Sequence, residues 1–157
     1  MRRRDPRDEL EDFRPDAPAG LFLSRKGNWF HDGQRVGHER LEALLHGSIA
    51  RDAAGSLIVT TGRDVLAFVA EDAPFAVVAV DGDVAVLDDG SREAVGDVVV
   101  GPDDRWRMRV KGGAFWALLS KSAAQTLERA LSDDGAALVL GARRVPVTTT
   151  QKSSWSD

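Results

Sequence analysis

The chain has 157 residues, of which 43% are hydrophobic, and its 21 Lys and Arg against 25 Asp and Glu give a formal net charge of −4. This balance gives no reason to expect a nucleic-acid polymer as a partner, and the lack of cysteine excludes disulfides, thiolate zinc sites and cysteine nucleophiles. No apolar run reaches the ~20 residues that span a bilayer, and no apolar stretch follows the first arginines as in a secretory signal, so we expect a cytoplasmic protein without a membrane span.

Both ends of the chain have the composition of tails. Residues 1–19 mix charged residues with proline, and residues 148–157 are polar apart from Trp155. Such segments bury too little apolar surface to offset the entropy lost on ordering, so we expect disorder at both ends. Between them we expect an N-terminal lobe over 20–72 and a C-terminal lobe over 73–147.

Short strands separated by glycine turns dominate the part between the tails. Alternating apolar residues predict hairpins over 21–36, 56–70, 75–87, 105–119 and 136–147. Two stretches have helical spacing instead. Over 38–49 the apolar face is Leu41, Leu44, Leu45 and Ile49; over 121–132 it is Ala123, Ala124, Leu127, Ala130 and Leu131, with Ser122 and Gln125 spaced as a capping box.

The order of these elements repeats along the chain. Hairpin, helix and hairpin over 21–70 recur over 105–147, and a unit this small cannot bury its own apolar face. The prediction is an α+β fold of two β-rich lobes related by a hairpin-helix-hairpin duplication, with the seam between lobes as the natural ligand cleft. Chance similarity of two short segments is the alternative.

All three histidines lie in the first predicted hairpin and helix. His38, Glu42 and His46 are spaced to share one stripe of a helix, which suits either a divalent metal or the polar rim of a core face. Because the sequence identifies no further ligand, we assign no metal site. Trp29 and His31 are two residues apart on one predicted strand and so share a sheet face. They either bind a planar ligand, or the tryptophan covers the core and the histidine beside it has its hydrogen bonds satisfied within the fold.

The segment "RWRMRVK" carries a row of cations. Arg105, Arg107, Arg109 and Lys111 alternate with Trp106, Met108 and Val110, and a strand would place the two sets on opposite faces. The face formed by Arg105, Arg107 and Arg109 is either an anion-binding surface or a solvated strand whose like charges deter edge pairing.

Three segments resemble a known family. "GNWFHDGQRVGHERLEALL", "ARDAAGSLIVTT" and "AEDAPFAVVAV" are similar, in order and spacing, to the bacterial domain of unknown function 1285 family, and the similarity continues more faintly to "ALVLGARRVPV". The resemblance implies a two-lobed α+β fold with internal duplication, a C-terminal lobe loosely similar to pleckstrin-homology domains, and a role in signal transduction through a nucleotide-like ligand.

The resemblance also implies a set of ligand-binding residues at the lobe interface: Trp29, His31, Arg51, Asp52, Glu71, Asp72 and Phe75. For the acidic pair the alternative is a polar turn closed by Pro74, and for Arg51 and Asp52 it is a helix-end cation followed by a turn aspartate. His38 replaces the family's usual arginine and Lys121-Ser122 its Arg-Pro, which indicates a divergent member.

We therefore expect a binding or regulatory module for a small anionic or nucleotide-like ligand, with no cofactor and no catalytic residue assigned. No Gly-x-Ser-x-Gly elbow, Walker loop or dinucleotide fingerprint occurs in the sequence, which favours binding over catalysis. One alternative is a pleckstrin-like module that binds a protein partner and no small ligand. Another is a metal-dependent hydrolase built on His38, Glu42 and His46.

Overall fold

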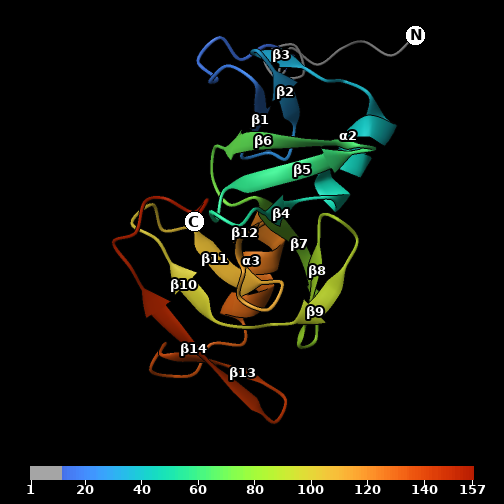
Figure 1. Cartoon of the computed structure of the whole chain (residues 1–157). Helices are drawn as coiled ribbons and strands as arrows, with labels where there is room; N and C mark the ends of the chain where they lie inside the picture. The colour runs from blue at the N-terminus through green and yellow to red at the C-terminus, as the bar shows by residue number, and fades with distance from the viewer. Residues whose placement is uncertain (1–11) are drawn as a thin grey trace, which may run out of the picture. The chain divides into compact units, whose positions relative to one another are not determined.

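The computed structural model describes residues 12–157, and the chain divides after Glu71 into two compact units, one residue before the predicted boundary. We call the part up to Glu71 unit 1 and residues 72–157 unit 2. The predicted α+β, two-lobed layout is confirmed in its coarse form, since each unit combines one curled sheet with a helix in the part that the structure describes (Figure 1).

Unit 1 contains a six-stranded sheet, counted over the described residues up to 71, in the order β3-β2-β1-β6-β5-β4. β1 and β6 pair in parallel, and the other neighbours are antiparallel. The predicted hairpins over 21–36 and 56–70 are present, and Gly33 and Gly62 adopt positive φ angles in their turns. The strands are β1 (Leu21–Leu23), β2 (Trp29–His31), β3 (Gln34–Arg35), β4 (Ala50–Arg51), β5 (Leu57–Thr61) and β6 (Asp64–Ala70).

The helix of unit 1, α2 (Glu39–Gly47), buries only part of the face that was predicted. Leu45 is buried, whereas Leu41 is 38% and Leu44 68% exposed. The phase is set by Glu42, whose carboxylate accepts a hydrogen bond from the Trp29 backbone N–H at 3.0 Å and so turns this side of the helix toward the sheet. His46, one turn after Glu42, is therefore buried beside Leu45.

The segment before β1 is ordered where the structure describes it. The backbone N–H of Arg14 donates to the carbonyl of Gly33 at 2.6 Å, and that of Arg35 donates to the carbonyl of Asp12 at 2.9 Å. The expected disorder over 1–19 is thus wrong for residues 12–19, because their backbone groups pair with the β2–β3 turn. Residues 1–11 lie outside the described part.

Unit 2 contains an eight-stranded sheet, counted over residues 72–157, in the order β13-β14-β10-β11-β12-β7-β8-β9. The pairs β10–β14 and β12–β7 are parallel. The three hairpins predicted here are present, while β9 and β10 were not predicted because three residues are too few to show alternation. The strands are β7 (Phe75–Asp81), β8 (Val84–Leu87), β9 (Arg92–Ala94), β10 (Val98–Val100), β11 (Trp106–Val110), β12 (Phe115–Leu119), β13 (Ala137–Leu140) and β14 (Arg143–Thr149).

The helix of unit 2, α3 (Lys121–Glu128), lies within the curve of this sheet and packs against β7 and β12 (Figure 1). Ala123 and Leu127 are buried, as predicted. The predicted capping box at Ser122 and Gln125 is wrong, because the hydroxyl of Ser120 accepts the hydrogen bond from the Ala123 backbone N–H at 3.2 Å. The helix also ends at Glu128, four residues before the predicted end.

The two halves of the predicted duplication differ in how their strands pair. In unit 1, β6 pairs with β1, which belongs to the first hairpin; in unit 2, β14 pairs with β10, which precedes the hairpin β11–β12. The duplication and the likeness to pleckstrin-homology domains stay predictions. None of the helices in the described residues has the length and apolar character needed to cross a membrane.

The C-terminal segment is docked, in contrast to the tail expected over 148–157. β14 extends to Thr149, and Trp155 is only 3% exposed, in a buried cluster with Ala73, Trp116 and Leu118. One tryptophan is enough to anchor a polar segment when a matching pocket exists elsewhere in the fold, and composition does not reveal that pocket.

Candidate anion-binding groove

A groove of about 380 Å³ lies in unit 2 where β11 begins, β12 ends and α3 begins. This volume is within the range of small-molecule sites. Its lining residues are Asp104, Arg105, Trp106, Leu119, Lys121, Ala124, Gln125 and Glu128. They come together because β11 and β12 form an antiparallel hairpin in which Arg107 pairs with Leu118, so the start of one strand adjoins the end of the other.

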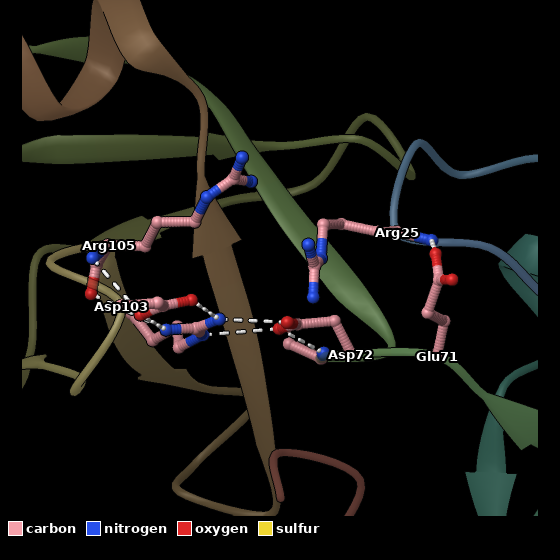
Figure 2. A network of polar contacts seen from close by, with 7 residues as sticks. Arg25, Glu71, Asp72, Asp103 and Arg105 are labelled. Atoms are coloured by element: carbon pink, nitrogen blue, oxygen red, sulfur yellow. Dashed lines mark hydrogen bonds and ion pairs between the residues drawn. The ribbon is translucent and has the colours of Figure 1, made fainter. Parts of the chain in front are cut away.

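Two cations of the groove are available for an anion. Within residues 12–157, neither the guanidinium of Arg105 nor the ammonium of Lys121 has a hydrogen-bond or ion-pair partner, and both residues are exposed. In Figure 2 the side chain of Arg105 points away from Asp103, with which only its backbone N–H bonds. A guanidinium fork and an ammonium group are the side chains that proteins use to bind phosphates.

A turn holds Arg105 at the edge of the groove. The backbone N–H of Asp104 donates to the carbonyl of Gly101 at 3.0 Å, and the side chain of Asp103 accepts from the backbone N–H of Arg105 at 3.2 Å. Asp104 has a φ of 62°, a left-handed conformation that aspartate tolerates better than most residues. The half-buried Trp106 follows at the start of β11 and contributes an indole ring to the groove.

Arg107, the next cation of the predicted basic row, is buried and fully engaged. Its guanidinium donates to both carboxylate oxygens of Asp72, at 3.1 and 2.8 Å, and to both of Asp103, at 2.8 Å (Figure 2). Burial works to lower the pKa of Arg107, but these hydrogen bonds outweigh it and raise the pKa above its usual value. The hydrogen bonds from Arg107 hold the pKa of Asp103 well below its usual range, against a smaller effect of burial.

The remaining cations of the row also have partners. The guanidinium carbon of Arg109 lies 4.1 Å from the centroid of the Trp116 ring, and Lys111 donates to Asp89 at 2.7 Å. The interpretation of the row as an edge strand is therefore wrong, whereas an anion-binding role for this face stays a prediction. β11 is a central strand and not an edge, and of the three arginines assigned to an anion-binding face only Arg105 is open to a ligand.

Trp29 and His31, the predicted stacking pair, have different surroundings in unit 1. Trp29 is 1% exposed and packs edge-on against Phe68, with 4.9 Å between ring centroids. The side chain of His31 is 68% exposed, and its Nδ1 lies 3.6 Å from a carboxylate oxygen of Asp32. Alternation places both side chains on the same face of β2. The core covers this face at Trp29 but leaves it exposed to solvent at His31.

Arg51, Asp52 and Glu71 take part in local structure of unit 1. The side chain of Asp52 accepts hydrogen bonds from the backbone N–H groups of Ala54 and Ser56 at 2.9 Å each, as expected for a turn aspartate. The guanidinium of Arg51 donates to a backbone carbonyl at 2.9 Å. Glu71 accepts from Arg14 at 2.7 Å; burial works to raise its pKa, but hydrogen bonds from Arg14 and from the backbone of Arg25 lower it overall. Their role in ligand binding stays a prediction.

Asp72 and Phe75, the predicted site residues in unit 2, are both buried. Asp72 is the partner of Arg107, and Phe75 packs edge-on against Phe115 with 5.3 Å between ring centroids. The structure therefore brings neither of them to the groove, and any role in ligand binding for this pair also stays a prediction.

The stripe of His38, Glu42 and His46 holds α2 in place. His38 caps the helix by accepting the Leu41 N–H at Nδ1, at 3.2 Å, Glu42 bonds to the Trp29 backbone, and His46 lies edge-on to the Trp29 ring at 6.1 Å. No group of three or more His, Cys, Asp or Glu placed to hold a metal ion occurs over residues 12–157. A metal-dependent hydrolase on this stripe therefore has no support from the described residues.

Sequence reasoning missed Trp106, Lys121 and Gln125 as groove residues. Trp106 was assigned to the face opposite Arg105, Gln125 was considered only as part of a capping box, and Lys121 only as a departure from the family's Arg-Pro. A signal was available: a hairpin over 105–119 that turns at Gly112 must place Arg105 beside the residues that follow position 119.

Two larger hollows, of about 510 and 590 Å³, lie beside β13 and β14. Their cations have partners: Arg144 lies 4.0 Å from Asp134, and Arg143 donates to the carbonyl of Val95 at 2.8 Å. An anion would have to compete with these contacts, whereas the charged groups of Arg105 and Lys121 have no partner within the described residues 12–157. The groove at α3 is therefore the better candidate.

No family model and no curated protein matches this sequence. Two solved structures are similar to it. A DUF1285 family protein from Silicibacter pomeroyi DSS-3 is 16% identical, with a TM-score of 0.64 over 93% of this chain and 89% of that one. A DUF1285 family protein from Shewanella baltica OS155 is 14% identical, with a TM-score of 0.55 over 73% of this chain and 94% of that one. At these identities the likeness establishes the fold, and at that level the resemblance seen in the sequence is confirmed.

Proposed function

We propose that this protein, which has the fold of DUF1285 family proteins, is a binding module for a small anionic ligand with a planar ring, a nucleotide-like molecule being the leading class. One observation carries the proposal. Arg105 and Lys121, whose charged groups have no partner among residues 12–157, line one groove of unit 2 together with the half-buried Trp106.

The groove offers a separate contact to each part of such a ligand. Arg105 presents a planar fork and Lys121 a point charge to a phosphate, and Trp106 presents its ring to a base. Gln125 on α3 both donates and accepts hydrogen bonds, and the carboxylate of Glu128 accepts from an amino or hydroxyl group. The carboxylates of Asp104 and Glu128 both line the groove and repel a phosphate, so the anionic end of the ligand lies toward Arg105 and Lys121 and away from these two groups.

These groups suit recognition and not chemistry. A guanidinium does not lose its proton in a protein, and we assign no catalytic residue to the groove. Reversible binding of a charged metabolite is the property of a sensor, so we propose a regulatory role in signal transduction.

The test is a binding screen with the full chain. Inorganic phosphate, nucleoside mono- and diphosphates and the parent nucleosides are compared by thermal shift, and ligands that shift the melting temperature are measured by calorimetry. A ligand at 100 times its Kd should add about 2.7 kcal/mol of stability. We expect a phosphorylated ligand to bind and its nucleoside to bind at least about tenfold more weakly, which corresponds to 1.4 kcal/mol.

Variants locate the site. Arg105→Ala, Lys121→Ala and Trp106→Ala should each weaken binding by about tenfold or more, whereas Arg63→Ala, which removes an exposed cation of unit 1, should leave the Kd unchanged. Equal losses for Arg63→Ala and Arg105→Ala would mean that net charge alone attracts the ligand. A screen in which no phosphorylated compound shifts the melting temperature would refute the proposal.

A pleckstrin-like protein-interaction module is the second candidate, because β6 exposes apolar side chains. Val65 is 61% and Val69 49% exposed, and their positions four residues apart place them on one strand face. This candidate predicts that Val65→Asp abolishes capture of a protein partner, while Arg105→Ala leaves capture intact.

A further inference from the structure

Trp155 occupies a pocket formed by both polar and apolar groups of unit 2. Its ring packs edge-on against Trp116, with 5.1 Å between centroids and an interplanar angle of 87°. The guanidinium carbon of Arg107 lies 4.3 Å from the Trp155 ring centroid, and Ala73 and Leu118 complete the cluster. An indole on a buried guanidinium combines area burial with a cation–π attraction that is strengthened by desolvation.

The pocket has room for an indole because one wall is a glycine. A Cβ at Gly101 would lie 3.1 Å from the ring of Trp155, 2.9 Å from a carboxylate oxygen of Asp103 and 2.8 Å from a nitrogen of Arg107. The φ of Gly101 is not in the left-handed region, so the backbone itself does not require glycine here. The small residue is needed because the ring and the ion pair fill the space.

Trp155 is the only fully buried residue of its segment, residues 150–157. Residues 150–157 form neither helix nor strand. After the last backbone bond to the sheet, from Thr150 N–H to the carbonyl of Val100 at 3.0 Å, the neighbours Ser153 and Ser154 are exposed. A single buried anchor side chain is also the way in which short peptides bind to preformed pockets.

We propose that this pocket is a recognition site for a tryptophan-bearing extended segment, filled within the chain by residues 150–157 and, at high protein concentration, by the same segment of a second copy. The second copy fits because its segment has the identical chemistry. Exchange between two chains replaces each lost contact with the same contact, so its cost is only that of opening the segment and of association.

The first experiment supplies the segment as a separate molecule. A labelled peptide of residues 148–157 is titrated into the Trp155→Ala chain and followed by fluorescence anisotropy. We expect saturable binding to this chain, at least about tenfold weaker binding of a peptide with alanine in place of Trp155, and little binding to the unmodified chain, whose pocket is filled. Failure of the peptide to bind a folded Trp155→Ala chain would overturn the proposal.

The second experiment needs no variant and therefore decides the matter if Trp155→Ala does not fold. Amide hydrogen exchange is measured on the unmodified chain. We expect the hydrogen-bonded amides of the segment, those of Thr150 and Lys152, to exchange at least about 100-fold faster than those of β11 and β12, because the segment opens without unfolding the sheet. Exchange of both sets at one rate would show that the segment is an integral part of the core, and the proposal would fail.

The second copy is tested by light scattering at increasing protein concentration. We expect a dimer fraction in the unmodified chain that an excess of the 148–157 peptide reduces. A chain that stays monomeric at every concentration, or a dimer that the peptide does not affect, would exclude exchange between copies.

Discussion

The four cations of the β11 segment show how far neighbouring residues of one type can differ in their surroundings. Arg105 is exposed without a partner among the described residues, Arg107 is 1% exposed between two carboxylates, Arg109 stacks on Trp116, and Lys111 pairs with Asp89. A buried ion pair adds little net stability compared with an apolar core, but removing one partner leaves an unpaired charge in the interior. Arg107 therefore has a structural role, and a direct role in anion binding falls to Arg105.

The pKa of Asp103 predicts how stability depends on pH. Because hydrogen bonds from Arg107 hold this pKa below its unfolded value, Asp103 stabilises the fold at pH values above its ordinary pKa, and this contribution is lost as the pH falls through the depressed folded pKa. We expect the free energy of unfolding, measured by urea denaturation from pH 6 to pH 2, to fall less steeply in Asp103→Asn than in the unmodified chain.

Asp104 provides the matched control for this measurement. It is adjacent and exposed, its side chain has no partner over residues 12–157, and asparagine tolerates its left-handed backbone equally well. Asp104→Asn should keep the original slope. An unchanged slope in Asp103→Asn would show that the ion pair with Arg107 does not contribute in solution.

At the scale of elements, the two helices differ in how well spacing fixes the buried face. In α3, Ala123 and Leu127 are both apolar and buried, so the strongest apolar stripe is also the packed one. In α2 the apolar residues spread over too wide an arc, and the contact of Glu42 with the Trp29 backbone decides which part of the arc faces the sheet.

The phase of α2 can be measured with two leucines. Leu45→Ala should cost about 2 to 5 kcal/mol because it opens a cavity in the core of unit 1, whereas Leu44→Ala, one residue earlier and 68% exposed, should change stability by about 0.5 kcal/mol or less. Urea denaturation of both variants provides the values. A larger loss for Leu44→Ala than for Leu45→Ala would place the opposite face of the helix against the sheet.

At the scale of the whole molecule, the groove and the tryptophan pocket both belong to unit 2. The partners of Arg107, the wall at Gly101 and the lining of the groove all lie between Asp72 and Trp155. The eight strands of this unit also pair only with one another within the described chain.

Residues 72–157 expressed alone should therefore fold and bind the ligand found in the screen. We expect one cooperative unfolding transition by circular dichroism and a Kd within about threefold of that of the full chain, or 0.7 kcal/mol. Loss of binding by a cooperatively folding fragment would show that residues before Asp72 contribute to the site.

The sequence by itself determined the local structure: the glycine turns, the hairpins over 21–36, 56–70, 75–87, 105–119 and 136–147, the two helices and the resemblance that anticipated the fold. These follow from near neighbours, because alternation, helical spacing and turn chemistry act over a few residues. The tertiary structure alone decided which charges are buried, since the partner of Arg107 is Asp72, 35 positions away. The tertiary structure also decided that Trp155 is docked and that Arg105 and Lys121 are open to a ligand. Whether a cation or an indole has a partner depends on every segment that the fold brings within contact distance, and spacing along the chain does not indicate which segments those are.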